Sequence, residues 1–476
     1  MSDSAAKAFL VLSAATMLLV GMLLFRPAYF SSSAGLIVLI GGEILLAAVA
    51  NYRKTFLPIV LVCFVVAGSG LPFHSELLQG RWIVLATGAV FGFAIYLKTH
   101  LHKLQTFHLL ALFCVLSALV SAFVSAYPNE ALLKALSLFL LFLYAATGAR
   151  TAIPVQPERF FTSLVSAIEV FVWVVGVYYF VLRTQIFGNP NSLGAIMAVA
   201  CIPVLLWGFL TAQARTRRLR LGIELVIALL LLFNSFARAA ILASVVSSVL
   251  VCLSLRQYRL LIKGIGLAVL VAICAVLFVP QQAEAPSWNG SESIGSVFLY
   301  KGKREMGVFG SRRSVWQQTW NVIRENPWFG SGYGTSETSE DMTKLAYAAH
   351  HIDSWVIREH GNSYLAIIEW TGLLGVVPFY ALLALAVRNA GLVFSWARRT
   401  QDAFSPAIPA AAIVVAGLID AAFEDWMFAV GYYLCVFFWV MAFILVDVMP
   451  SRGAIYVPES PLPLPGTVFG MAVPTK

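Results

Sequence analysis

The amino-acid sequence predicts an all-α polytopic membrane protein, a bundle of about 12–14 transmembrane helices with one large loop outside the cytoplasm. Three observations predict this class. The 476 residues are 60% hydrophobic and only 12% charged, with a mean hydropathy of +0.84. Apolar segments long enough to cross a bilayer follow one another along most of the chain. Lysine and arginine gather in the connections between them, and this composition excludes an ordinary soluble domain.

Each apolar segment is expected to form one helix of the bundle. The first has Lys7 ahead of an apolar run, as a signal peptide does, but the same pattern continues along the chain and favours a transmembrane helix. The candidate segments lie near residues 8–25, 34–50, 56–72, 82–97, 106–124, 131–148, 161–181, 192–212, 221–236, 239–255, 264–280, 362–387, 405–423 and 426–447.

The distribution of positive charge predicts the orientation of the bundle. Basic residues fall in alternate connections, and the positive-inside rule places those connections in the cytoplasm together with both termini. The net charge of +9 therefore reflects membrane orientation and not nucleic-acid binding. The basic residues concerned are Lys7, Arg53, Lys54, Lys98, Lys103, Arg150, Arg159, Arg215, Arg217, Arg218, Arg220, Arg256, Arg259, Lys263, Arg388, Arg398, Arg399 and Arg452.

Residues 221–255 decide the topology of the C-terminal half. A single helix would be about 52 Å long, against a bilayer core of about 30 Å. A hairpin that turns at residues 234–238 keeps Arg220 and Arg256 on the same side, so a hairpin is predicted. Residues 281–361 then form one large outer loop with nine acidic and eight basic residues. The bundle is expected to cover residues 1–448, and the proline-rich tail 449–476 is expected to be disordered and cytoplasmic.

Three arginines are candidates for binding an anion. Arg238 lies at the outer turn of the hairpin, where it either extends its charge to the interface or forms part of an anion site. The segment GSRRSVWQQTW predicts an amphipathic helix at the membrane surface, with Arg312 and Trp316 on one face. Its arginines are either solvated or bind phosphate through Arg312 or Arg313. The following ENPWFGSGYGT segment predicts a tight turn that ends this helix.

His360 directly precedes the apolar segment that begins at Asn362. It is either an interfacial histidine or a general base, since imidazole titrates near neutral pH. A third interpretation is a metal site of His350, His351, Asp353 and His360, whose spacing matches no standard zinc pattern. Three acidic residues within apolar segments, Glu43, Glu169 and Glu369, are either proton-transfer groups or structural partners. Glu424 and Asp425 lie at the outer end of a predicted span, where they are expected to line an external cavity.

The ordered motifs resemble those of the O-antigen ligase and polysaccharide polymerase family of bacterial envelopes. They are GNPNSLG at 188–194, NSFARAA around Arg238, Arg312 with Trp316 before the ENPWFGSGYG turn, and a His-x-Asn-x-x-Leu run that leads into Glu-x-x-Gly-x-x-Gly at 360–375. The resemblance covers about residues 188–380. The chain departs from the family in having alanine on both sides of Arg238, a glycine between His360 and Asn362, and more predicted spans than the usual twelve.

The resemblance implies a GT-C-like glycosyltransferase at the periplasmic face of the bacterial inner membrane. The donor would be a glycan on undecaprenyl diphosphate, and the acceptor a sugar hydroxyl on lipid A core or on another lipid-linked glycan. Transfer would invert the anomeric centre without a metal or other cofactor. The expected site residues are His360 as general base, Arg238, Arg312 and Arg313 at the diphosphate, and Asn191, Asn362, Tyr364 and Glu369 in the substrate cleft.

Two other classes of function compete with this interpretation. A proton-coupled transporter or flippase of lipid-linked glycans would use Glu43, Glu169 and Glu369 as a proton path, but no convincing internal repeat is visible. A structural scaffold would tolerate substitution of the arginines. Within the enzyme class, the extra predicted spans favour a polymerase over a ligase.

Overall fold

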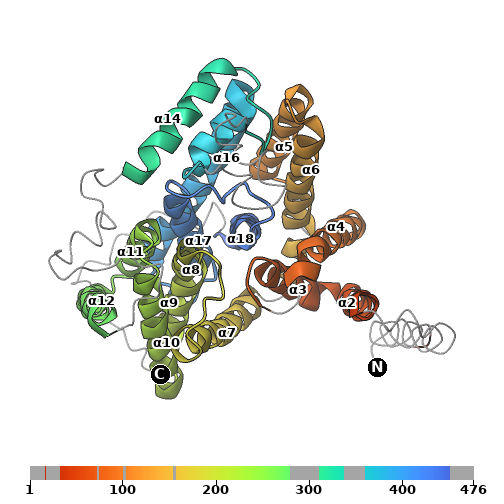
Figure 1. The fold of residues 1–476 in the computed structure, drawn as a ribbon. Coiled ribbons are helices and arrows are strands. Elements are labelled where there is room, and N and C mark those ends of the chain that lie inside the picture. Colours follow the sequence, from red (N-terminus) through yellow and green to blue (C-terminus); the bar gives the residue numbers. More distant parts are fainter. Residues whose placement is uncertain are drawn as a thin grey trace, which may run out of the picture.

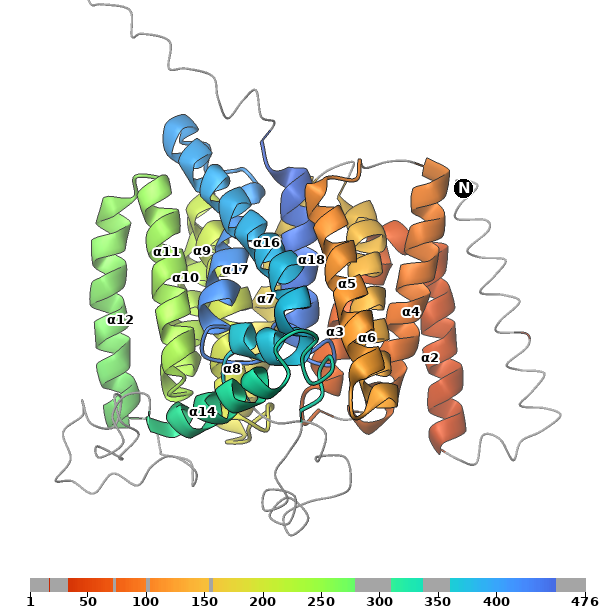
Figure 2. The same cartoon turned by 90° about the horizontal axis from the view of Figure 1, so that it is seen from above.

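The computed structural model describes residues 17, 33–71, 74–99, 103–153, 157–278, 310–336 and 360–450. Within these residues all regular secondary structure is helical, which confirms the predicted all-α class. Figure 2 shows long helices that run side by side as one bundle. The predicted span at 8–25, apart from Met17, and most of the tail after residue 448 lie outside the described residues.

Fifteen α-helices are described, and short π-helical or 3-10 segments extend some of them. Their bounds are α2 Ser33–Ala50, α3 Tyr52–Ala67, α4 His74–Thr99, α5 Thr106–Val124, α6 Pro128–Leu143, α7 Pro157–Gly176, α8 Pro190–Ile196, α9 Ile202–Thr211, α10 Arg215–Asn234, α11 Arg238–Ser254, α12 Tyr258–Phe278, α14 Gly310–Glu325, α16 Ser363–Thr400, α17 Ala407–Asp420 and α18 Tyr433–Val448.

The described helices account for the predicted spans from residue 34 onward, since each predicted segment overlaps one of them. Among the described residues, six helical segments are long and apolar enough to cross a membrane. They are His74–Thr99, Thr106–Val124, Pro128–Ala152, Pro157–Val181, Pro190–Thr211 and Ser363–Thr400. Shorter apolar helices, among them α11, α17 and α18, complete the bundle.

The predicted hairpin over 221–255 is confirmed, because α10 and α11 are separate helices joined by a short turn. Phe236 in that turn has φ +51°, and the Ser235 hydroxyl accepts the Ala237 N–H at 3.3 Å. Gly194 of α8 faces the turn, where a Cβ would lie 2.5 Å from the Cβ of Ala237. The absent side chain lets α8 pack directly beneath the residue that precedes Arg238.

Helix α18 lies at the centre of the bundle, as Figure 1 shows. Its residues from Tyr433 to Val446 are all buried, including the large side chains of Trp439 and Phe443. A helix that is apolar on all sides belongs in the interior of a membrane protein, where neighbours cover every face. Helices α3, α16 and α17 contact it directly.

The connection between α17 and α18 is longer than predicted. The predicted spans 405–423 and 426–447 left two residues for it, whereas α17 ends at Asp420 and α18 begins at Tyr433. Side chains from other elements bind the backbone carbonyls of this connection and replace a helical hydrogen-bond ladder. The donors and acceptors are Ser363 Oγ to Glu424 O at 2.7 Å, Trp439 Nε1 to Met427 O at 2.8 Å, Tyr333 OH to Phe428 O at 3.0 Å, and Arg81 Nη1 to Gly431 O at 2.6 Å.

The basic connections lie together at the end of the bundle opposite α14 (Figure 2). A fully buried arginine fixes this end: Arg150 binds both carboxylate oxygens of Asp447 through Nε and Nη2. Its Nη1 also lies 2.7 Å from Nε2 of His108. The ion pair joins the end of the α6 segment to the last turn of α18.

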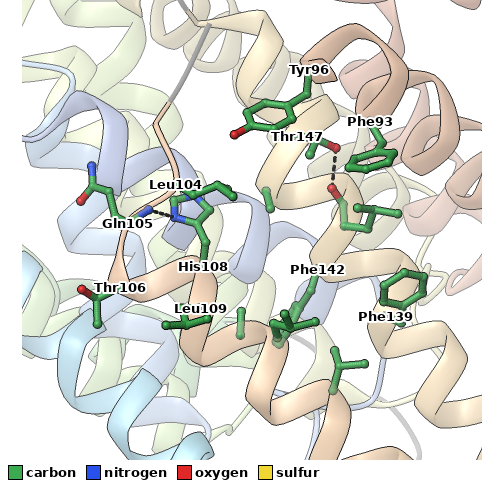
Figure 3. Close-up of a pocket in the computed structure, with 15 residues that line it drawn as sticks. Phe93, Tyr96, Leu104, Gln105, Thr106, His108, Leu109, Phe139, Phe142 and Thr147 are labelled. Carbon is green, nitrogen blue, oxygen red and sulfur yellow. Dashed lines mark hydrogen bonds between the residues drawn. The ribbon is translucent and has the colours of Figure 1, made fainter. Parts of the chain in front are cut away.

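An apolar cavity of about 560 Å³ lies between α4, α5 and α6, and Figure 3 shows the side chains that line it. Phe93, Leu109 and Phe139 line its apolar wall, and Gln105 and His108 lie at one end. It is formed by the halves of these helices nearest the basic connections. The cavity is therefore separate from the residues that the motifs single out, which lie at the α14 end.

The buried ion pair makes a prediction about stability. Asp447→Leu leaves the Arg150 guanidinium buried without its carboxylate, and we expect unfolding to become easier by about 3–5 kcal/mol. Thermal denaturation in detergent measures the loss. Arg150→Met combined with Asp447→Leu should recover much of it, because no charge is then left unpaired. Equal melting of the single variant and the wild type would contradict a structural role for the pair.

Candidate active site

Helix α14 lies across the end of the bundle and not along it (Figure 2). Arg312, Val315 and Trp316 are half-buried against the bundle and Thr319 is fully buried, whereas Arg313 and Trp320 on the other face are exposed. The predicted amphipathic helix is thus confirmed, and it ends at Glu325, directly before Asn326 and Pro327, as expected. Its buried face carries Arg312 onto the bundle.

Helix α16 is broken at Gly372, which has φ +57° and ψ −161°. The glycine-rich turn 327–334 fills the break. The N–H groups of Leu373 and Leu374 donate to Pro327 O at 2.9 Å and Trp328 O at 3.1 Å. In return, the N–H groups of Ser331 and Gly332 donate to Glu369 O at 2.9 Å and Trp370 O at 3.2 Å.

Glycine is required on both sides of this junction. A Cβ on Gly372 would lie 2.5 Å from the carbonyl carbon of Trp328, and a Cβ on Gly330 would lie 2.4 Å from that of Trp370. Both residues also have positive φ, which side chains disfavour. The turn 327–334, which contains Gly330, Gly332 and Gly334, therefore has a structural role: it holds the two parts of α16 together. The backbone of this turn packs directly against Gly372.

The short first part of α16 presents Glu369 to His360. Asn362 begins the helix as its N-cap, since its side-chain oxygen accepts the N–H of Tyr364 at 2.8 Å and of Leu365 at 3.0 Å. Gly361 before it has φ +59°, which turns the chain sharply. The inserted glycine that departs from the family pattern is thus the residue that aims His360 back under α16.

His360 is buried, with 1% of its surface exposed, and carboxylates lie on both sides of its ring. Its Nε2 lies 3.1 Å from Glu369 Oε1 and 3.2 Å from Ser336 Oγ. On the other edge, Nδ1 lies 3.6 Å from Asp425 Oδ2. Trp370 packs edge-on against the imidazole, with ring centroids 5.2 Å apart. Two carboxylates beside one imidazole stabilise its protonated form.

Asp425 is the member of this group that reaches solvent, with 28% of its side chain exposed. It also accepts the backbone N–H of His360 at 2.8 Å. Partial burial acts to raise the pKa of Asp425, but the hydrogen bonds and charge of His360 together hold that pKa below its usual value. Asp425 therefore stays ionised beside the histidine at neutral pH.

Arg312 forms the second part of the site. Its Nη2 donates to Glu424 Oε1 at 2.9 Å, and its Nη1 donates to the carbonyl of Gly361 at 3.1 Å. The guanidinium also lies over the ring of Phe423, 5.8 Å from its centroid. Asn191 of α8 reaches the same carboxylate, with Nδ2 3.4 Å from Glu424 Oε1. The consecutive residues Glu424 and Asp425 thus bind the arginine and the histidine, respectively.

Arg238 begins α11 at the same end of the bundle and is half-buried. Burial lowers the pKa of its guanidinium, and the positive charge of Arg312 adds to this effect, so the two arginines are within electrostatic range of each other. Two guanidiniums in one partly buried place form a site that favours an anion of more than one charge.

Not every predicted site residue joins this group. Arg313 is exposed on the outer face of α14, Asn362 caps a helix, and Tyr364 donates its hydroxyl to Leu418 O at 2.5 Å. Glu169 belongs elsewhere: it pairs with Arg220 at 2.9 Å, near the basic end of the bundle. Glu369 pairs with His360 at the α14 end, so these two acids do not adjoin. His350, His351 and Asp353 of the metal alternative lie outside the described residues.

The sequence did not rank three residues that the structure brings to the site. Glu424 and Asp425 were expected only to line an outer cavity, and Ser336 was not singled out. In the sequence, the two consecutive acidic residues after Phe423, at the end of an apolar segment, were the feature that could have indicated a site there. Charged residues beside membrane segments are costly to bury and are therefore usually paired.

Together these features define a polytopic helical membrane protein with two arginines and a carboxylate-flanked histidine at one end. Residues 223–380 match the family model described as O-antigen ligase. The match contains Arg238, Arg312, His360 and Glu369, and it confirms the predicted resemblance to the O-antigen ligase and polymerase family. No curated protein matches the chain. The match, which spans residues 223–380 of this membrane protein, supports a function of O-antigen ligase or polymerase type in surface polysaccharide synthesis.

The junction at Gly372 makes a prediction. Gly372→Ala places a methyl group against the backbone of Trp328 at a positive φ, so we expect a lower melting temperature and a loss of activity of at least tenfold. Gly391→Ala in the same helix is the matched control, because its Cβ would meet nothing within 4 Å beyond the helix's own backbone, and it should melt at or above the wild-type temperature. Equal melting temperatures and activities of the two variants would show that the contact between the turn 327–334 and α16 is not required.

Proposed function

We propose that the protein is a glycosyltransferase that moves a glycan from undecaprenyl diphosphate to a sugar hydroxyl during polymerisation or ligation of a surface polysaccharide. The observation that carries this proposal is the contact between the two halves of the site. Arg312 binds the carbonyl of Gly361, the residue next to His360, so a cation for a leaving group and a base for a nucleophile are adjacent.

The leaving group in this reaction is a lipid diphosphate. As the bond from the anomeric carbon to the diphosphate oxygen breaks, negative charge accumulates on that oxygen. Arg312 and Arg238 stabilise it in a partly buried place, where fixed cations act more strongly than in water. The proposed chemistry needs no metal or other cofactor, because these cations neutralise the leaving group.

The acceptor hydroxyl forms the new bond. Its oxygen attacks the anomeric carbon on the face opposite the diphosphate, which inverts that centre, and its proton passes to His360. Glu369 holds Nε2, so Nδ1 is the nitrogen that takes the proton, at the edge where Asp425 is exposed. The two carboxylates stabilise the imidazolium that results, as the aspartate does in a Ser-His-Asp triad.

The positive-inside rule supports a periplasmic site. The clusters of lysine and arginine are at the end of the bundle opposite α14 (Figure 2), and that end is the one expected in the cytoplasm. Arg238, Arg312 and His360 would then face the periplasm of a bacterial inner membrane, with both termini cytoplasmic. Residues 1–448 would form the catalytic bundle.

Substitution of the proposed catalytic groups tests the function. His360→Ala should lower transfer by about 10²–10⁴-fold, and Arg312→Ala by about 10²–10³-fold, with each protein still present in the membrane. Arg313→Ala is the matched control and should change transfer little, because its side chain is exposed. The assay follows extension or transfer of a labelled lipid-linked glycan in proteoliposomes. Full transfer by His360→Ala would remove the histidine from the mechanism.

Glycan analysis of a deletion strain separates the two kinds of enzyme. Single-unit chains on lipid A would identify a polymerase. Uncapped lipid A together with accumulated long lipid-linked glycan would identify a ligase. Unchanged glycans together with impaired movement of the lipid-linked glycan would instead identify a transporter.

The pH dependence of transfer tests the carboxylate beside the base. The depressed pKa of Asp425 keeps it charged down to acidic pH, where it favours the protonated imidazole. The ionised Asp425 stabilises the folded protein fully above the ordinary aspartate pKa. This stabilisation is lost as the pH falls through the lowered pKa of Asp425 in the folded protein. Asp425→Asn should reduce transfer about tenfold at neutral pH and move the acidic midpoint of the activity profile to lower pH. An unmoved midpoint would show that Asp425 acts only on structure.

A further inference from the structure

We propose that Glu424 is a competing carboxylate: it occupies the anion-binding position of Arg312 in the substrate-free protein, and it returns there to help the lipid diphosphate leave. This inference rests on the proposed function, because it takes Arg312 to be a ligand of the diphosphate. It adds a regulatory group to that same site.

The first observation is the ion pair itself. Glu424 Oε1 lies 2.9 Å from Arg312 Nη2, with 17% and 23% of the two side chains exposed. A carboxylate and a phosphate oxygen take the same donors of a guanidinium. A diphosphate that approaches the exposed side of Arg312 must therefore either share the guanidinium donors with the Glu424 carboxylate or displace that carboxylate.

The second observation is that Arg312 has other contacts that position it. Its Nη1 donates to Gly361 O, and its guanidinium lies over the ring of Phe423. Neither contact involves the Glu424 side chain. The Glu424 side chain is thus not needed to aim the arginine, and its most distinctive contribution is its negative charge.

The third observation is the balance of charge. Arg238 and Arg312 repel each other, and Glu424 compensates for this when the site is empty. Once a diphosphate is bound, the same carboxylate is a like charge close to it. Glu424 therefore stabilises the empty site and destabilises the occupied one. Asn191 Nδ2, 3.4 Å from Oε1, offers the displaced carboxylate another donor.

This arrangement has a consequence for turnover. After the glycan has been transferred, undecaprenyl diphosphate remains on the arginines as product. A carboxylate that competes for Arg312 weakens the bound product and speeds its release, and product release commonly limits the rate of an enzyme. Removal of the charge should lower KM and kcat together.

Binding of undecaprenyl diphosphate to the full-length protein in nanodiscs tests the proposal. Glu424→Gln should bind this lipid about tenfold more tightly than the wild type, with a lower KM and a lower kcat in the transfer assay. Glu424→Asp, whose carboxylate is one methylene shorter, should lie between them. Glu325→Gln is the matched control: it removes one exposed charge from the end of α14 and should leave binding unchanged. The fold should be kept in Glu424→Gln, since Ser363 binds the backbone carbonyl of residue 424 and not its side chain.

A double variant separates the two levels of the proposal. Arg312→Ala should weaken binding, and adding Glu424→Gln to it should give no tightening, because the carboxylate acts through the arginine. Equal or weaker binding by Glu424→Gln alone, with Arg312→Ala still defective, would overturn the competing carboxylate and leave the proposed function intact. Wild-type binding by Arg312→Ala would overturn the diphosphate assignment itself.

Discussion

The break in α16 is the constraint on which the rest of the site depends. In a regular helix the carbonyls of Glu369 and Trp370 would accept the N–H groups four residues later, at Leu373 and Leu374. Within a membrane protein such groups must find partners, because little water reaches them. The turn 327–334 supplies all four partners, two carbonyls and two N–H groups. A broken helix is thus stable only with this turn seated on it.

This junction links the outer helix to the bundle. The turn that satisfies α16 directly follows α14, so seating the turn fixes the end of α14 and lays the helix across the bundle. Arg312, on the buried face of α14, then meets Gly361 and Glu424. The same break leaves Glu369 on a short helical segment beneath which His360 fits. One backbone arrangement therefore positions both Arg312 and His360.

Much of the fold could be predicted from the sequence because long apolar segments have few alternatives in a bilayer. The hairpin at Arg238 followed from helix length and charge alone, and the amphipathic α14 followed from the spacing of Arg312, Val315, Trp316 and Thr319. The length of the connection 421–432 could not be predicted, because apolar residues flank Glu424 and Asp425 on both sides and left only these two residues for it. It is held open by distant donors such as Tyr333 and Arg81. Glu424 and Asp425 lie in that connection, so their partners depended on tertiary contacts that no local pattern encodes. Asn362 shows the opposite case, where a local cap accounts for a residue that had been assigned to the substrate cleft.

Mapping the contacts of the lipid diphosphate tests the central claim most directly. An undecaprenyl diphosphate analogue with a photoreactive group next to the diphosphate would be crosslinked to the protein in nanodiscs, and the modified peptides identified by mass spectrometry. The account predicts modification in the first turns of α14 and in residues 421–432, where Arg312 and Glu424 meet. Modification confined to α4, α5 and α6, around the cavity of Figure 3, would contradict it.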